Sequence, residues 1–228
     1  MTDKERLQIG WDCDGVGFDF KGIFIDLVTL NRHHRLTNPS VQSVAMKNSA
    51  KFKFYEDAGL TSQDFLSMID LFVEADGFAE NSIVPGFKDA IENSWEYGDP
   101  VLCTAREYPH QTLELRKKIF GDTHNWVQKQ KLAFRSVIIS KNKTISELDM
   151  ILEDSAESCH NFLRTGTMLP VLFTQPWNAD DPYPVRVDTH QEYVEIAREA
   201  SQFDKPFWEY IEPRIQDTFN ELRNLTDV

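Results

Sequence analysis

Short apolar runs alternate along the chain with longer polar stretches of helix length. We expect strands at the apolar runs, which are Leu7–Trp11, Val101–Cys103, Val137–Ile139, Met150–Leu152 and Val171–Phe173. Runs of this kind, separated by helix-length segments, are typical of a parallel sheet that helices cover on both faces. The pattern therefore predicts the α/β fold class.

Helices are expected between these strands, at Gly86–Tyr97, Pro109–Phe120 and Ala156–Leu163. The first follows Pro85, and the second opens with proline, which is favoured in the first helical turn because no hydrogen-bonded N–H is lost there. Near the end of the chain, apolar residues recur at helical spacing and predict a helix that packs on the core. These residues are Phe207, Ile211, Ile215, Phe219 and Leu222.

About 90 residues separate the first expected strand from the second, which is longer than a simple crossover connection needs. Part of this stretch carries apolar residues at helical spacing. These are Phe65, Met68, Ile69 and Phe72. We therefore expect a helical cap of residues 19–84, inserted into a core that residues 1–18 and 85–228 form.

Charge and composition limit the class of partner. The chain has 37 acidic and 24 basic residues and a net charge of -13, which disfavours a nucleic-acid polymer or an anionic membrane surface as the main partner. The charged N-terminus and the lack of any apolar run of about 18 residues argue against a signal peptide and a membrane span. We expect a cytoplasmic protein in which Cys13, Cys103 and Cys159 are reduced.

Polar residues follow four of the expected strands at the point where each strand ends. They are Asp12–Gly15, Thr104–Arg106, Ser140 with nearby Lys143, and Glu153–Asp154. Because open α/β sheets bind ligands at the carboxyl ends of their strands, we expect these groups to converge on one edge. Four acids, a hydroxyl and a lysine are the components of a site for a divalent metal and a phosphate.

The acidic residues suit phosphate-ester hydrolysis. Mg²⁺ prefers oxygen ligands, usually one or two carboxylates with waters and substrate phosphate, and Asp12 and Asp154 can supply the carboxylates. A carboxylate nucleophile, for which we choose Asp12, divides hydrolysis into an aspartyl-phosphate step and a water step. Asp14 can protonate the leaving oxygen and later accept a proton from the attacking water.

Other groups can hold the phosphate itself. Lys143 can neutralise the acidic cluster, and backbone N–H groups around Gly15 and Ala105 can donate to phosphate oxygens. No Gly-x-Gly-x-x-Gly follows the first expected strand, no Walker-type loop occurs, and the six histidines lack zinc-ligand spacing. The sequence therefore favours a phosphatase over a dinucleotide, Walker-type or zinc protein.

Each motif also has a structural explanation that involves no catalysis. An Asp-x-Asp-Gly sequence is common in turns and helix caps, Lys143 could be a solvated lysine, and Glu153–Asp154 could cap the following helix. A calcium loop counted from Asp12 fails, because Val16 and Ile23 stand where polar ligands are needed. The joint order of the motifs, each at a strand end, favours the catalytic interpretation.

The motifs taken together resemble the haloacid dehalogenase superfamily and, within it, the 5′(3′)-deoxyribonucleotidases. The superfamily pattern is Asp-x-Asp-Gly after the first strand, Thr or Ser after the second, a lysine and an acidic pair. The resemblance to the nucleotidases keeps family order from about residue 7 to residue 180. Its further segments are Asp19-Phe20, Gly77-Phe78, Val84-Pro85-Gly86, Trp126-Val127, Asn142-Lys143-Thr144, Val171–Thr174 and Trp177-Asn178.

The resemblance implies a Rossmann-like core, a small helical cap, and Mg²⁺-dependent hydrolysis of nucleoside monophosphates, preferably deoxy ones. By this resemblance Asp12 is the nucleophile, and Asp14 is the acid/base and a metal ligand through its carbonyl. Asp154 is implied as the second carboxylate ligand. Thr104 and Lys143 are implied to hold the phosphate.

The resemblance also bears on substrate recognition and on departures from the family. Phe20 resembles the aromatic residue that stacks on the base, and we expect Phe78 to join it, although both also fit the pattern of core aromatics. Glu153 replaces the usual aspartate, which can shift its role beside the metal ligands. Ala105 and Arg106 replace the usual Ser-Pro, so one phosphate contact is lost and Arg106 can add another.

Two other functions remain open at this point. One is a phosphatase that acts on a different small phosphate monoester, and the other is a catalytically silent nucleotide-binding protein on the same fold. The intact motif residues argue against the silent protein. The sequence leaves the oligomeric state open, a homodimer included.

Overall fold

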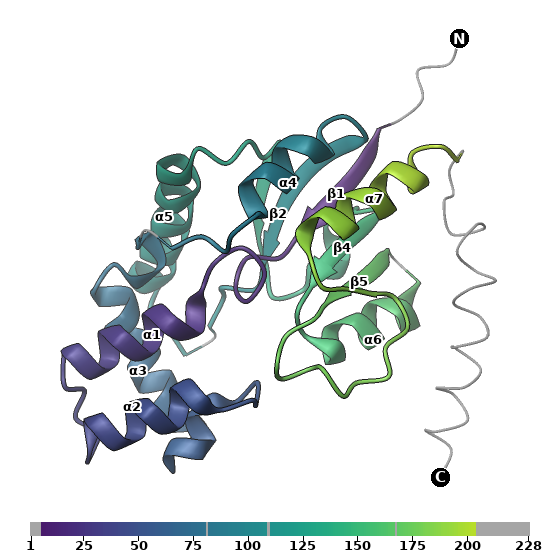
Figure 1. Ribbon diagram of the computed structural model, residues 1–228. Helices are drawn as coiled ribbons and strands as arrows, with labels where there is room; N and C mark the ends of the chain where they lie inside the picture. Colours follow the sequence, from purple (N-terminus) through teal and green to yellow (C-terminus); the bar gives the residue numbers. More distant parts are fainter. Residues whose placement is uncertain (1–5, 81, 109, 167, 204–228) are drawn as a thin grey trace.

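A six-stranded parallel sheet lies at the centre of the computed structural model, which describes residues 6–203 except 81, 109 and 167 (Figure 1). The strand order is β3-β2-β1-β4-β5-β6. The strands are β1 (Leu7–Trp11), β2 (Gly98–Thr104), β3 (Ser136–Ile139), β4 (Met150–Glu153), β5 (Leu169–Phe173) and β6 (Arg186–Val187). The predicted α/β class with a parallel sheet is confirmed.

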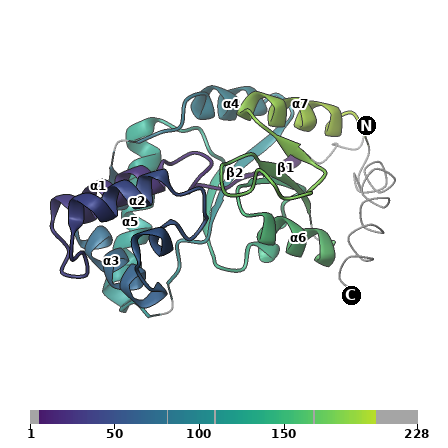
Figure 2. The same cartoon turned by 60° about the horizontal axis from the view of Figure 1, so that its bottom comes forward.

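Helices cover both faces of this sheet, and others form the segment between β1 and α4 (Phe87–Ser94). They are α1 (Phe20–Leu30), α2 (Pro39–Asn48), α3 (Ser62–Glu74), α4 (Phe87–Ser94), α5 (Leu113–Gln130), α6 (Ala156–Thr165) and α7 (His190–Ala200), with short 3₁₀ helices η1 (Phe54–Ala58), η2 (Gly77–Ala79) and η3 (Lys143–Ile145). Figure 2 shows α4 and α7 side by side on one face and α6 on the other. Because helices cover both faces, the side chains on both faces of the strands are mostly apolar.

Large aromatic side chains fill the space under α4 and α7. The Trp11 ring contacts Phe87 edge to face at 5.6 Å between centroids and Tyr193 at 4.8 Å. A second cluster of buried residues lies on the α6 side of the sheet, and includes Cys103, Ile151 and Phe162. The three cysteines of the chain are buried and form no disulfide, as predicted.

Several element boundaries differ from the sequence-based predictions. The second strand begins at Gly98 rather than Val101, because parallel pairing with β1 includes Gly98, Asp99 and Pro100. The helix expected from Pro109 begins instead at Leu113, where the Thr112 side chain caps the first turn. It runs on to Gln130. The expected helix at Phe207–Leu222 lies outside the described residues.

The segment between β1 and α4 is helical, as predicted, and it lies to one side of the sheet (Figure 1). Its interior is aromatic, with the rings of Phe20, Phe24 and Phe72 within 5.7 Å of one another. It packs on α5, where the Trp126 indole donates to the Ser82 carbonyl at 2.8 Å. This helical insertion is therefore anchored to α5.

Candidate active site

A tight loop follows β1 and carries the Asp-x-Asp-Gly motif. The N–H groups of Gly17 and Phe18 both donate to the Cys13 carbonyl at 2.8 Å, and the Gly15 N–H donates to the Phe18 carbonyl at 3.0 Å. Gly15 has a φ of 81° and its missing side chain leaves room for the Asp154 carboxylate, which a Cβ would strike. The glycine is needed here for both reasons.

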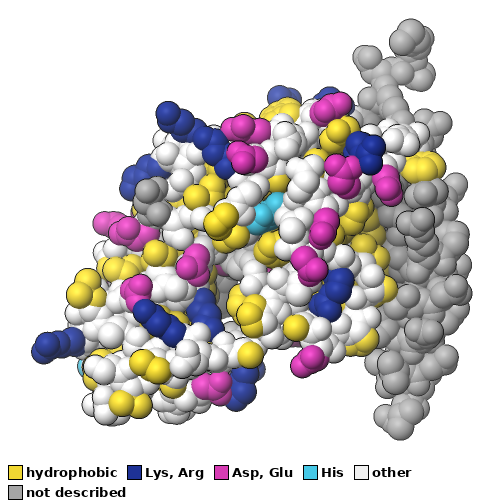
Figure 3. Space-filling view, viewed as in Figure 1, with side chains coloured by type: hydrophobic (Ala, Val, Ile, Leu, Met, Phe, Trp, Pro, Cys, Tyr) yellow, Lys and Arg dark blue, Asp and Glu magenta, His cyan; other side chains and the backbone are white. Residues whose placement is uncertain are grey.

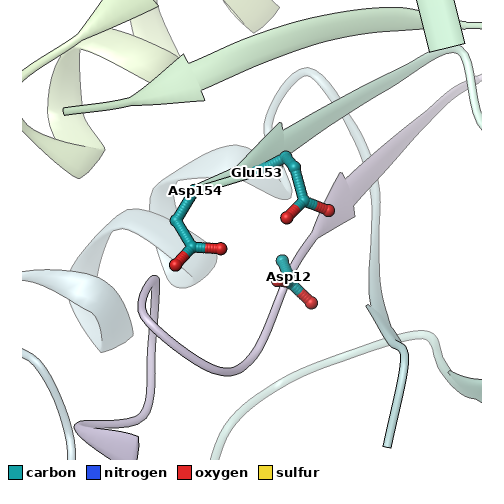
Figure 4. Close-up of side chains that lie close together, drawn as sticks. All are labelled: Asp12, Glu153 and Asp154. Atoms are coloured by element: carbon teal, nitrogen blue, oxygen red, sulfur yellow. The ribbon is translucent and has the colours of Figure 1, made fainter. Parts of the chain in front are cut away.

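Three carboxylates meet at the ends of β1 and β4. The side chains of Asp12, Glu153 and Asp154 are buried, and each offers an oxygen within 4.8 Å of the others. Figure 4 shows these oxygens facing a common space. The Asp12 N–H donates to the Leu152 carbonyl at 2.9 Å, so the sheet's own hydrogen bonds set the position of Asp12. The predicted convergence of these acids is confirmed.

Lys143 is buried against this cluster. Its Nζ lies 2.7 Å from Asp12 Oδ1 and 2.6 Å from Glu153 Oε2. The other carboxylate oxygen of Glu153 accepts from the Ser155 N–H at 3.2 Å. Glu153 therefore uses both oxygens within the protein and holds Lys143 beside Asp12. These two contacts give Glu153 a role at the position where an aspartate is usual.

The electrostatics of the cluster favour a bound cation. Burial, together with the charge of Glu153, raises the pKa of Asp12 to about 8, although Lys143 opposes the shift. Burial also raises the pKa of Asp154 well above its usual range, and the charges of Glu153 and Asp12 add to this effect. Burial would lower the pKa of Lys143, but the carboxylates of Asp12 and Glu153 raise it above the ordinary value.

Lys143 thus brings one positive charge to three carboxylates, and negative charge is left uncompensated in a buried site. A divalent cation would neutralise this charge. The donors are all oxygens, which is the ligand set of a hard cation such as Mg²⁺. The residues present therefore fit a magnesium ion.

Thr104 and Ala105 lie at the same edge of the sheet. Thr104 ends β2 and is buried, and its carbonyl accepts from the Ser140 N–H at 2.9 Å, which joins the ends of β2 and β3. Ala105 is exposed. Their expected contacts with phosphate stay predictions.

The Asp14 carboxylate is not part of the group of three carboxylates and pairs with Arg106. Its Oδ1 accepts from Arg106 Nη2 at 2.5 Å and its Oδ2 accepts from Nε at 2.9 Å. Arg106 is buried, and its Nη1 donates to Thr123 Oγ1 at 3.1 Å. The guanidinium also lies 4.8 Å from the ring centroid of Phe18 and 4.3 Å from that of Phe78. The structure thus brings Arg106 to Asp14, and a contact with phosphate would require the guanidinium to move.

The two aromatic candidates differ in exposure. Phe78 is 0% exposed and packs against Phe72 and Arg106. Phe20 is half-buried, with its ring stacked at 6.1 Å from that of Phe78. Phe20 therefore retains surface that a ligand can reach, whereas Phe78 supports it from the interior. Their roles in substrate binding stay predictions.

The loop after β5 contributes residues to which sequence reasoning gave no role. Asn178 donates to the Asp154 carbonyl at 2.8 Å, and the Trp177 indole donates to the same carbonyl at 3.2 Å. Gln175 donates to the Gly15 carbonyl at 2.7 Å. This loop follows the fifth predicted strand, so its position at the carboxyl edge was the signal that could have marked these residues.

Charged side chains of both signs are scattered over the face of the molecule shown in Figure 3. The basic residues on this face form no continuous track of the kind that a polyanion requires. Among the described residues, no helix is both long and apolar enough to cross a membrane.

The fold is that of the haloacid dehalogenase superfamily of hydrolases. A "predicted phosphatase" from Clostridium acetobutylicum is 15% identical, with a TM-score of 0.55 over 86% of this chain and 99% of that chain. A haloacid dehalogenase-like hydrolase from Burkholderia xenovorans is 14% identical, with a TM-score of 0.53 over 86% and 98%. A HAD hydrolase from Bacillus subtilis, solved with magnesium bound, is 13% identical, with a TM-score of 0.51 over 85% and 99%.

A comparison of the sequence with models of protein families identifies the family. The model of the family described as "5′ nucleotidase, deoxy (Pyrimidine), cytosolic type C protein" matches residues 6–203, and the chain belongs to this family. It is therefore a phosphoric monoester hydrolase of the 5′-nucleotidase type. A comparison with curated proteins finds no match.

Proposed function

We propose that the protein hydrolyses nucleoside monophosphates, above all deoxyribonucleoside monophosphates, to nucleoside and phosphate with Mg²⁺ as cofactor. The observation that carries this proposal is the buried cluster in which Lys143 lies 2.7 Å from Asp12, with Asp154 beside it, in a chain of the nucleotidase family. The family description also supports a cytosolic location.

Asp12 and Asp154, with the Asp14 carbonyl, would hold the magnesium ion. When bound, Mg²⁺ supplies positive charge that offsets the charge of the phosphate during transfer. Asp12 attacks phosphorus, so a bond from its oxygen to phosphorus forms as the bond to the nucleoside oxygen breaks. Asp14 gives a proton to that leaving oxygen. Water then attacks the phosphorus of the aspartyl-phosphate, Asp14 accepts a proton from it, and phosphate and free Asp12 are released.

The remaining residues at the sheet edge bind the phosphate. Thr104 and Lys143 contact its oxygens, and the backbone N–H groups near Gly15 and Ala105 donate to them. The buried position of Lys143 supports this role, because a desolvated ammonium interacts more strongly with developing negative charge than an exposed one. Glu153 contributes by fixing Lys143 in place.

We propose that residues 19–84 form a cap over a core of residues 1–18 and 85–228, and that the cap reads the base through Phe20. The aromatic interior of the insertion and the half-buried ring of Phe20 support this. Stacking of a base on an aromatic ring is worth roughly 1–3 kcal/mol. Phe78 then acts as the buried support of the Phe20 ring.

The proposed function is tested with a panel of ribo- and deoxyribonucleoside monophosphates, sugar phosphates and an aryl phosphate, with phosphate release measured with and without Mg²⁺. The wild-type enzyme should prefer deoxyribonucleotides. Phe20→Ala should raise KM for nucleotides about tenfold and leave the aryl phosphate nearly unchanged. Preference of the wild type for a phosphate ester without a base would overturn the nucleotidase proposal and favour the broader phosphatase.

A matched control for the aromatic variant is Phe120→Ala, which removes an exposed phenylalanine of α5 that contacts His124. This variant should leave both KM values unchanged. Thermal unfolding of the two variants is compared as well. If Phe20→Ala loses activity on all substrates together with stability, Phe20 is a core residue and does not read the base.

Stability should depend on Mg²⁺ in a pH-dependent way. The pKa of Asp12 rises from 3.8 to about 8 in the folded protein, so between these values the folded state holds a proton that the unfolded chain has released. The raised pKa of Asp154 acts in the same direction. The free energy of unfolding of the metal-free protein should therefore fall as pH rises toward 8.

Mg²⁺ neutralises the same carboxylates, so it should raise the Tm more at pH 8 than at pH 6. At a concentration of about 100 times Kd, the gain is about 2.7 kcal/mol. Calorimetry in chelator and in excess Mg²⁺ at the two pH values measures both effects. An equal Mg²⁺ gain at both pH values would contradict metal binding at these carboxylates.

A further inference from the structure

Arg106 is a buried cation next to the motif that carries the chemistry. In the resemblance to the nucleotidases it stands where a proline is usual, so this side chain is a feature of the present chain rather than of the motif. Its side chain is 0% exposed, whereas that of its partner Asp14 is 26% exposed. A fully buried guanidinium is costly unless its N–H groups are satisfied, so its contacts indicate its role.

The guanidinium contacts four side chains. Nε and Nη2 donate to the Asp14 carboxylate, which places two parallel hydrogen bonds on one partner. Nη1 donates to Thr123 of α5, whose hydroxyl in turn donates to the Ile119 carbonyl at 2.8 Å. The plane lies near the rings of Phe18 in the β1 loop and Phe78 in the insertion. The side chain of Arg106 is therefore held from the β1 loop, from α5 and from the insertion.

We propose that Arg106 is a positioning residue for Asp14, which sets where the carboxylate lies and ties it to the insertion through Phe78. The proposal rests on the proposed function, in which Asp14 transfers protons to and from the reacting oxygens. A bidentate pair fixes both the distance and the plane of a carboxylate, which a single hydrogen bond or a lysine cannot do.

The geometry opposes a direct contact between Arg106 and the phosphate. The side chain has no exposed surface, and its Nε, Nη1 and Nη2 each donate to a protein oxygen. Movement toward a phosphate would leave Asp14 and Thr123 without these bonds and would separate the cation from Phe78. The side chain of Arg106 is thus better placed to act through Asp14 than on the substrate.

The dependence on the leaving group distinguishes a residue that positions Asp14 from one that contacts the phosphate. An acid that protonates the leaving oxygen matters most for a poor leaving group, such as a nucleoside hydroxyl, and least for an aryl oxide. Arg106→Ala should therefore lower kcat for a deoxyribonucleoside monophosphate by roughly 10²-fold, because small displacements of a reacting group have effects of this size. The kcat for 4-nitrophenyl phosphate should change less than about threefold, and KM for both should change little.

A double-mutant cycle gives a second readout. In the Asp14→Asn background, Arg106→Ala should cause almost no further loss on the nucleotide, because the group that it positions is already gone. Arg106→Lys, which keeps the charge but not the paired hydrogen bonds, should show the same substrate pattern as Arg106→Ala with a smaller loss. Added guanidinium ion should restore part of the nucleotide kcat of Arg106→Ala.

The control variants distinguish a folding defect from a loss of Asp14 positioning. Arg164→Ala removes an exposed arginine of α6 that binds only Asn161 among its described partners, and it should match the wild type on both substrates. Thr123→Val removes one anchor of Arg106 and should give a weaker form of the Arg106 pattern. If Arg106→Ala does not fold, Arg106→Lys and Thr123→Val carry the test.

Three results would overturn the proposal. They are equal kcat losses on both substrates, losses of Asp14→Asn and Arg106→Ala that multiply, and a KM increase on both substrates with kcat unchanged, which is the result for a phosphate contact. A different result, a wild-type enzyme that does not hydrolyse nucleotides, would contradict the proposed function. In that case the comparison is made between its preferred alkyl phosphate and the aryl phosphate.

Discussion

Asp12→Asn should abolish turnover while the protein stays folded. The amide cannot form the acyl phosphate, so kcat should fall by roughly 10⁴-fold or more on every substrate. The thermal stability of the metal-free protein, in contrast, should stay the same or increase. Burial and Glu153 raise the pKa of Asp12 to about 8, so its ionised form costs free energy in the folded metal-free protein. In chelator at a pH near 8, the variant should unfold at the same temperature as the wild type or higher.

Phosphate release and calorimetry on the same preparation test this prediction. Acid quenching of the reaction with labelled substrate should trap phosphate on the wild-type protein and none on Asp12→Asn. Turnover close to that of the wild type in Asp12→Asn would exclude Asp12 as the nucleophile, whatever its effect on stability.

Lys143→Met should lose both activity and stability, in contrast to Asp12→Asn. Its ammonium contacts Asp12 at 2.7 Å and Glu153 at 2.6 Å, and its removal leaves buried carboxylates without their cation. Breaking a buried ion pair in this way costs about 3–5 kcal/mol. Loss of one charged contact to the transferring phosphoryl group should lower kcat by about 10²–10³-fold.

The matched control is Lys88→Met on α4, which removes an exposed lysine at the limit of ion-pair distance from Glu92. It should change neither kcat nor the free energy of unfolding by a measurable amount. Denaturant unfolding in chelator measures the stability effect, and saturating Mg²⁺ should recover part of it. A Lys143→Met protein as stable and as active as Lys88→Met would contradict the position assigned to this lysine.

The sheet and its acidic edge could be predicted because they depend on local patterns. Apolar runs such as Met150–Leu152 mark buried strands whatever surrounds them, and the first polar residues after them must lie at the sheet edge. This is why Asp12, Lys143 and Asp154 were brought together by the structure as expected. The inserted helices were predictable for a similar reason, since their apolar spacing is visible in the sequence.

The remaining features depend on tertiary partners. Gly98 and Pro100 read as turn residues, yet both lie in β2 because β1 pairs with them. The two-residue strand β6 is too short to leave a pattern. The sequence predicts that Arg106 can add a phosphate contact, but no sequence pattern reveals that its side chain contacts Asp14, Thr123 and Phe78. These partners lie 92, 17 and 28 positions away along the chain.

The loop after β5 holds the acidic edge by its main chain. Asn178 and Trp177 bind the carbonyl of Asp154, and Gln175 binds the carbonyl of Gly15, so none of these contacts uses a carboxylate. These hydrogen bonds therefore do not depend on the carboxylate of Asp154. A single substitution of this carboxylate could therefore remove catalytic activity while the fold is kept. Such a variant could still act as a binding protein.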